Sequence, residues 1–104
     1  MPVNPTVAVF GTLRFPADRV HEVLPHLKRL VEETRAKDGC IAYDVAEDPF
    51  DPGLLRFSEL WPDRSSLERH LKAAHIEPWR IAARSCGLQQ RAFTAFAIGD
   101  TWPV

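Results

Sequence analysis

Apolar residues recur along this chain with two different spacings, which predict where its strands and helices lie. Runs of β-branched and aromatic residues predict strands, and apolar residues three and four apart predict amphipathic helices. Gly11, inside the first strand, predicts a bulge or the close approach of another group. Four strands are expected, at Thr6–Leu13, Cys40–Ala46, Leu54–Trp61 and Leu88–Ile98.

The first helix is expected between the first two strands. It opens at Phe15–Asp18, is bent at Pro25, and ends at Asp38 and Gly39, with Gly39 just past the C-cap. One face of this helix carries an apolar stripe with helical spacing. The stripe consists of Val20, Val23, Leu24, Leu27, Leu30, Val31 and Thr34.

Two further helices are expected after the third strand. Asp63 is a good N-cap for the first of them, which ends at His75, and Glu77–Ser85 predicts a shorter helix opened by Pro78. The residues expected to face the core from the helix after Asp63 are Leu67, His70, Leu71 and Ala74.

This order of elements, βαββαβ, indicates the α+β class and a ferredoxin-like split βαβ fold. Four antiparallel strands carry two main helices on one face, with a short extra helix. The length of 104 residues suits a single domain spanning 1–104.

The face of the sheet away from the helices is also expected to be apolar. The last strand contains Phe93, Phe96 and several alanines on both of its faces. A strand buried on both sides needs a second cover, so the pattern predicts a homodimer with two sheets packed face to face. Phe50 and Trp102 either reach across to the partner or fold back on their own sheet.

Composition and charge narrow the class of protein. A formal net charge of -1 and no basic block argue against nucleic-acid binding, and 45% hydrophobic residues argue against disorder. Met1–Pro5 lacks the features of a signal peptide, and no apolar stretch approaches the ~20 residues that span a bilayer. Cys40 and Cys86 suit a reducing compartment. A cytoplasmic location without membrane contact is therefore expected.

The candidate chemistry gathers between Leu54 and His75. His70 lies on the apolar stripe of its helix, and Glu59 lies on the strand that this helix covers. We expect a hydrogen bond between Glu59 and His70 that orients the ring as a general base, or else a pair that only satisfies itself structurally. His75, at the helix end, is the other candidate base or a C-terminal capping residue.

Four further residues are candidates for substrate binding. Trp61 and Tyr43 can stack on an aromatic ligand, Phe57 can add apolar wall, and Arg56 can hold a phenolate or carboxylate. The alternative is that the aromatic residues are plain core and that Arg56 lies at a rim. Phe10, Trp79 and Phe93 are further wall candidates.

Metal and nucleotide sites are not expected. On one continuous helix His70 and His75 would point about 140° apart, which is poor geometry for a shared ligand. The sequence also lacks a P-loop and a GxGxxG motif. A bound metal ion or nucleotide cofactor is therefore not expected from these motifs.

Three segments resemble the antibiotic biosynthesis monooxygenase (quinol monooxygenase-like) family of the dimeric α+β barrels. They are Gly39–Val45, Phe57–Trp61, and Leu67–Leu71 with His75. The resemblance implies oxidation of a small aromatic or quinol substrate by O2 without metal, flavin or haem. It also implies a homodimer with a pocket in each subunit between sheet and helices.

Alternatives to this function remain open. The residues of the haem-degrading branch are not matched, since His70 stands where its tryptophan lies and Arg80 where its ligand histidine lies. The same scaffold could carry an isomerase or another small-metabolite enzyme, in which proton transfer involves no O2. It could also be a non-catalytic dimer that binds a ligand without changing it.

Overall fold

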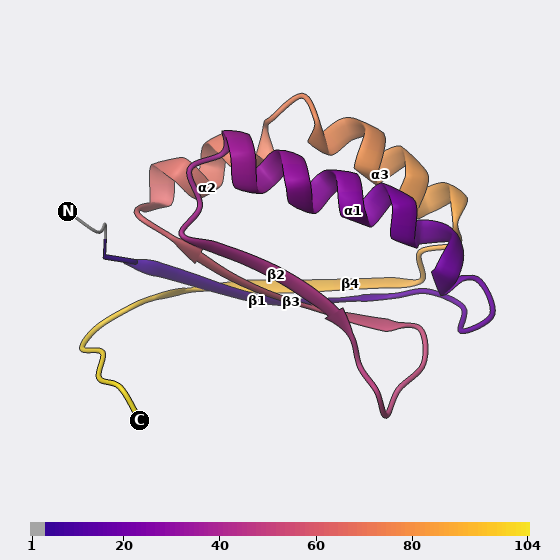
Figure 1. Cartoon of the computed structure of the whole chain (residues 1–104), viewed down its shortest axis with the longest axis horizontal. Helices are drawn as coiled ribbons and strands as arrows, with labels where there is room; N and C mark the ends of the chain where they lie inside the picture. The colour runs from indigo at the N-terminus through magenta and orange to yellow at the C-terminus, as the bar shows by residue number, and fades with distance from the viewer. Residues whose placement is uncertain (1–3) are drawn as a thin grey trace.

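The computed structural model describes residues 4–104, and its elements follow the predicted βαββαβ order, including the predicted short extra helix (Figure 1). Residues 1–3, part of the segment that argued against a signal peptide, lie outside this range. The strands are β1 (Val7–Arg14), β2 (Ala42–Glu47), β3 (Leu54–Trp61) and β4 (Gln90–Ala97). The helices are α1 (Val20–Lys37), α2 (Arg64–Leu71) and α3 (Ile76–Ser85).

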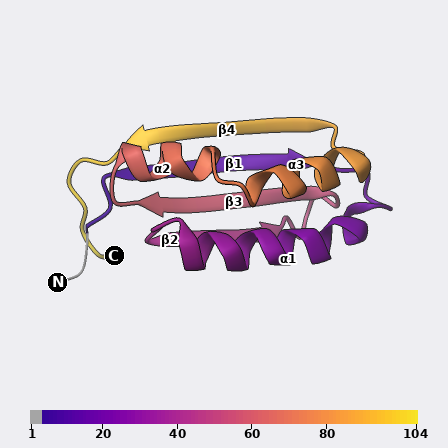
Figure 2. The same ribbon diagram turned by 90° about the horizontal axis from the view of Figure 1, so that it is seen from above.

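The strands form one antiparallel sheet in the order β2-β3-β1-β4. All the helices lie on one face of it, as the ferredoxin-like arrangement requires (Figure 1). Seen from above, α1 runs beside β2 while α2 and α3 run over β1 and β3, so β4 has no helix directly above it (Figure 2). The helix-facing side of the sheet near β4 is therefore the open side of the core.

The helices and strands begin and end close to the predicted residues, and β3 has the predicted bounds. The helix α1 begins at Val20 rather than at Phe15–Asp18, because Pro16 opens a turn whose carbonyl accepts from the backbone N–H groups of Arg19 and Val20. Gly39 has a φ of 74° just past the Asp38 C-cap, as predicted. Asp63 caps α2 by accepting a hydrogen bond from the Ser66 N–H at 2.7 Å.

The predicted helix from Asp63 to His75 is wrong in its second half. The helix α2 ends at Leu71, and the chain turns at 72–75 before α3 starts. Pro78 disfavours one continuous helix through α2 and α3, because there it would leave the Ala74 carbonyl without a donor and clash with it. In α3 it is the third residue, where no intrahelical N–H is needed. His75 thus precedes α3 and does not end α2, so its predicted role as a C-terminal capping residue is wrong. Its role as a second candidate base stays a prediction.

Gly11 shows the close approach that the sequence allowed, without a bulge. The pairing of β1 with β3 and β4 is uninterrupted along Val7–Arg14, and Gly11 lies opposite Phe93. A Cβ atom at Gly11 would lie 2.1 Å from Cδ2 of Phe93. The missing side chain lets the Phe93 ring lie flat over β1.

The sheet face away from the helices exposes two aromatic side chains among polar residues such as Arg56. Phe10 and Phe96 are 56% and 50% exposed there, with ring centroids 6.1 Å apart. Phe50 and Trp102 are 94% and 76% exposed, so neither folds back on its own sheet. Phe10 therefore does not line the core side, contrary to its predicted role as pocket wall. Within residues 4–104, no helix is long and apolar enough to cross a membrane.

Candidate active site

A cavity of about 450 Å³ lies between the helices and the β4 side of the sheet. This volume is in the range of small-molecule sites. Its walls come from β1, β2, β3, β4 and all three helices. The apolar and aromatic wall includes Leu13, Tyr43, Phe57, Leu67, Ile76, Trp79 and Phe93. Its ionisable groups other than Tyr43 are Glu59, His70, Arg80, Arg84 and Arg91.

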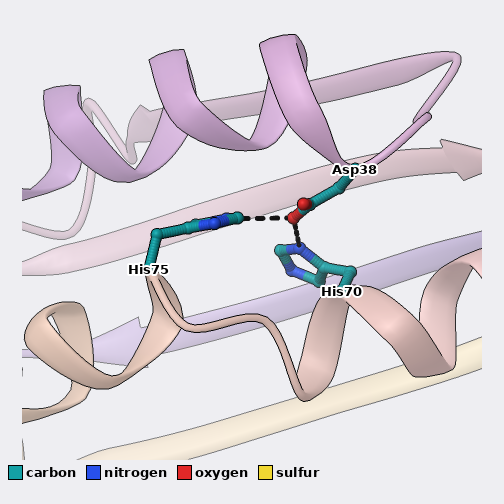
Figure 3. A group of neighbouring side chains, drawn as sticks. All are labelled: Asp38, His70 and His75. Carbon is teal, nitrogen blue, oxygen red and sulfur yellow. Dashed lines mark hydrogen bonds and ion pairs between the residues drawn. The ribbon is translucent and has the colours of Figure 1, made fainter.

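One wall of the cavity is backed by a cluster of Asp38, His70 and His75 (Figure 3). The carboxylate oxygen Oδ2 of Asp38 lies 2.6 Å from Nδ1 of His70 and 3.0 Å from Nε2 of His75. The three side chains are nearly buried, with exposed fractions of 7%, 5% and 10% in that order. The Thr34 hydroxyl lies 3.4 Å from the same nitrogen of His75. The end of α1 is thereby tied to α2 and to the turn before α3.

The shared acceptor decides which nitrogens of the rings carry protons. An ionised carboxylate only accepts hydrogen bonds, so His70 donates from Nδ1 and His75 donates from Nε2. In a neutral His70 ring the lone pair is then on Nε2, on the side of the ring away from Asp38 (Figure 3). His70 lines the cavity, and no side-chain nitrogen or oxygen in residues 4–104 is both sealed from solvent and unpaired. Nε2 is therefore the atom of His70 that can accept a proton from a ligand.

Burial favours the neutral form of the His70 ring, which is the form that can accept a proton. It lowers the pKa of His70 below its usual value, and the hydrogen bond and charge of Asp38 offset only part of that lowering. A neutral histidine held by a carboxylate is the arrangement of an oriented general base.

The predicted Glu59–His70 hydrogen bond is wrong. Oε1 of Glu59 instead accepts a hydrogen bond from Nε1 of Trp61 at 2.9 Å. The two side chains are two residues apart on β3 and so share a face, which places the indole N–H beside the carboxylate. Burial raises the pKa of the Glu59 carboxyl, while Trp61 and the charge of Arg91 lower it less. Glu59 still lines the cavity, so an acid and a histidine face the same space.

The three aromatic residues predicted for substrate binding lie on the helix side of the sheet, in two different roles. The Trp61 ring centroid is 4.9 Å from that of His70, but Trp61 is fully buried and does not reach the cavity. Tyr43 and Phe57 line the cavity and pack edge-on against each other. Burial raises the pKa of the Tyr43 phenol far above its ordinary value, so the hydroxyl stays protonated.

Arg56 is on the wrong face of the sheet for the substrate role predicted for it. Its side chain points away from the helices, and its Nε donates to Oδ2 of Asp48 at 2.7 Å. Residues of β3 alternate between faces, and Arg56 has the opposite parity to Phe57 and Glu59. Arg56 therefore lies exposed on the opposite face and does not line the cavity.

Two residues of the site were missed by reasoning from the sequence. Asp38 had a signal, because an acid at a helix C-terminus is opposed by the helix dipole and needs another reason to be there. Arg91 also had a signal, because it is the one charged residue of β4 and has the parity of Phe93.

The cluster of Asp38, His70 and His75 is also the group that a metal ion could use. One ligand atom from each residue lies within 4.8 Å of the others, so the predicted poor geometry of the two histidines is wrong. The break between α2 and α3 turns both rings toward one carboxylate. The separations of 2.6 Å and 3.0 Å from Asp38 are those of charge-assisted hydrogen bonds, and we interpret the cluster in that way.

Comparison with known proteins agrees with this fold. Residues 6–80 match the sequence profile of the family described as antibiotic biosynthesis monooxygenase. No curated protein matches the sequence at a significant level.

Solved structures match almost the whole chain. A candidate antibiotic biosynthesis monooxygenase from Deinococcus radiodurans is 26% identical with a TM-score of 0.87, over 94% of this chain and 97% of that one. A structure described as an antibiotic biosynthesis monooxygenase is 31% identical with a TM-score of 0.77, over 93% and 99%. A Mycobacterium tuberculosis protein is 28% identical with a TM-score of 0.79, over 91% and 96%.

Proposed function

The chain belongs to the antibiotic biosynthesis monooxygenase family, and from that membership we propose that it is a cofactor-independent monooxygenase. Its substrate is a small aromatic or quinol molecule, which it oxidises with O2. We expect residues 1–104 to form one domain of this family. The cytoplasm is its expected location.

The observation that carries the proposal is the His70–Asp38 pair at the cavity wall. Asp38 fixes the tautomer of His70, which leaves Nε2 as a base toward the cavity, while burial keeps the ring neutral. Asp38 is the positioning residue of this pair, and His75 holds the same carboxylate oxygen from the other side.

A base and an apolar cavity supply what such a reaction needs from the protein. A quinol that loses a proton to His70 becomes electron-rich enough to donate an electron to O2, so the substrate itself replaces a cofactor. One oxygen atom of O2 then enters the ring and the other leaves as water, which converts a quinol into a hydroxyquinone. The aromatic side chains of Tyr43 and Phe57 are placed to hold a planar ring.

We propose further that the protein works as a homodimer. The sheet face opposite the helices exposes Phe10 and Phe96 side by side, and such apolar surface is usually covered by a partner. A second copy of the same face is the cover that needs no other protein. Phe50 and Trp102 project from the loop and the tail, where they can reach a partner copy.

Oxygen uptake with a reduced menadione-type quinol tests the enzymatic proposal. We expect uptake above the buffer rate, and His70→Ala should reduce it by about 10²- to 10⁴-fold, the usual contribution of a general base. His26→Ala, which changes an exposed histidine on α1, is the matched control and should leave the rate unchanged. No uptake above buffer, or equal rates for wild type and His70→Ala, would exclude this role.

An isomerase is a second candidate, favoured by one feature of the cavity. Glu59, whose pKa is raised, and His70, whose pKa is lowered, line the same space. An acid and a base on one cavity can move a proton between two positions of a substrate. Turnover that proceeds at the same rate without O2 would favour this candidate over the monooxygenase.

A further inference from the structure

The cavity carries more positive than negative groups on its wall. Arg80, Arg84 and Arg91 line it, whereas Glu59 is its one carboxyl side chain. Burial raises the pKa of that carboxyl and so reduces its negative charge. The remaining lining is largely apolar. An apolar cavity with an excess of guanidinium groups favours a ligand that is apolar over most of its surface and anionic at one end.

Two of the three guanidinium groups already have partners. Arg80 donates to the Leu71 carbonyl at 2.9 Å and lies 3.8 Å from Glu77. Arg84 lies 3.9 Å from the other oxygen of Glu77. These contacts hold both side chains to α3 and the end of α2.

Arg91 is different, because no carboxylate of residues 4–104 lies within ion-pair distance of it. Its guanidinium carbon sits 4.6 Å from the centroid of the Phe93 ring, which steadies the side chain over the cavity wall without satisfying its five N–H donors. It extends from β4 and is itself exposed, so an incoming ligand can reach it. The guanidinium fork matches a carboxylate, which it can bind through two parallel hydrogen bonds.

We propose that Arg91 binds a carboxylate group of the substrate, so that the cavity takes a small aromatic acid. The aromatic part lies against Phe57 and Phe93, and the carboxylate faces the open, helix-facing side of β4. This inference rests on the proposed function in one respect, namely that the cavity is the substrate site. It moves to Arg91 the anion-binding role that the sequence suggested for Arg56.

Calorimetric titration without O2 tests it with two probes of similar shape, 2-naphthoate and uncharged 2-naphthol. We expect wild type to bind 2-naphthoate about tenfold more tightly or better, the scale of a charge-assisted hydrogen bond, and to lose much of this preference in high salt. Arg91→Gln should bind both probes equally, and Arg91→Lys should retain part of the preference. Arg56→Gln, which changes an arginine on the opposite face, is the matched control and should keep the full preference.

The outcomes separate this inference from the proposed function. If wild type binds both probes equally, or if Arg91→Gln keeps the preference for 2-naphthoate, the inference is overturned while oxygen uptake can still stand. If the preference depends on Arg91 but no aromatic acid or quinol consumes O2, the anion site stands and the monooxygenase proposal fails. The salt dependence in wild type needs no variant, so misfolding of Arg91→Gln would not leave the inference untested.

Discussion

Nδ1 of His70 lies 2.6 Å from Oδ2 of Asp38, which joins α2 to the C-cap of α1 across 32 positions of sequence. This short contact between nearly buried groups orients the ring and ties two helices together at the cavity wall. The contact orients the His70 ring as the base of the site. Because the orienting carboxylate belongs to another residue, a change at Asp38 tests its role separately from that of His70.

Asp38→Asn should lower the rate of oxygen uptake by about 10- to 100-fold, the usual effect of removing a group that orients a functional histidine. Asp38 raises the pKa of His70 against the larger effect of burial, so its loss should lower that pKa further. The acidic limb of the pH–rate profile should then move to lower pH. Asp44→Asn, at an exposed acid paired with Arg35, should leave rate and profile unchanged. A reduced rate with an unmoved acidic limb would indicate that Asp38 is only structural.

The stability of the fold should also depend on pH through His70. Its folded pKa is lowered from 6.5, so between these two values the unfolded state binds more protons. The free energy of unfolding should therefore hold above about pH 6.5 and fall as the pH drops below it. Asp38, His75 and Arg80 are the charged or titratable neighbours that act on this ring.

Urea unfolding at pH 7.5 and pH 5.5 measures this dependence. His70→Gln removes the titrating ring, so the difference in unfolding free energy between the two pH values should shrink in the variant. The exposed His21 provides the comparison, because His21→Gln should keep the difference found in wild type. Equal differences in wild type and His70→Gln would contradict the prediction.

The parts of the fold that local patterns determine could be predicted from the sequence. Most residues of β3 alternate between buried and exposed, and its bounds were predicted in full. Asp63 and Gly39 mark helix ends by their own chemistry. The partner of His70 depends instead on where α1 ends in space relative to α2. That distance follows from packing between helices, which no local pattern contains.

The position of His75 was also not predicted from the sequence, although the residues that determine it lie nearby in the chain. A single helix through residues 63–75 would separate the two histidine rings, and the turn before α3 brings them together. Pro78 carried the signal for that turn, although it lies three residues beyond His75. Arg56 was predictable, because its parity on β3 already placed it opposite Glu59.

Trp61→Phe should destabilise the protein by about 1–3 kcal/mol, because it leaves the buried Glu59 oxygen without its donor. The same hydrogen bond lowers the pKa of Glu59, so its removal should raise that pKa further. Urea unfolding at pH 7.5 gives the free-energy change. Trp102→Phe is the control at a tryptophan that is 76% exposed, and it should stay within about 0.5 kcal/mol of wild type. Equal effects of the two changes would show that the Trp61 indole N–H contributes nothing.

Gly11→Ala should destabilise the protein because the new methyl group meets the Phe93 ring. The cost of such overpacking is about 1–3 kcal/mol. In a Phe93→Ala background the ring is gone, so the same change at Gly11 should cost much less, and urea unfolding of all four proteins measures the coupling. Additive costs would mean that the strand itself, and not the ring, requires glycine there.

Phe96→Asp should convert a dimer into a monomer, because it would place a charge in the contact between two sheets. Wild type is expected to sediment as a dimer at micromolar concentration, and the variant as a monomer with an unchanged circular dichroism spectrum, since Phe96 lies outside the core. Leu24→Asp is the matched control. Leu24 is 49% exposed, against 50% for Phe96, but it lies on α1, on the helix side of the sheet. It should therefore remain dimeric. A wild type that sediments as a monomer at this concentration would refute the homodimer, because the exposed Phe10 and Phe96 would then have no partner copy to cover them.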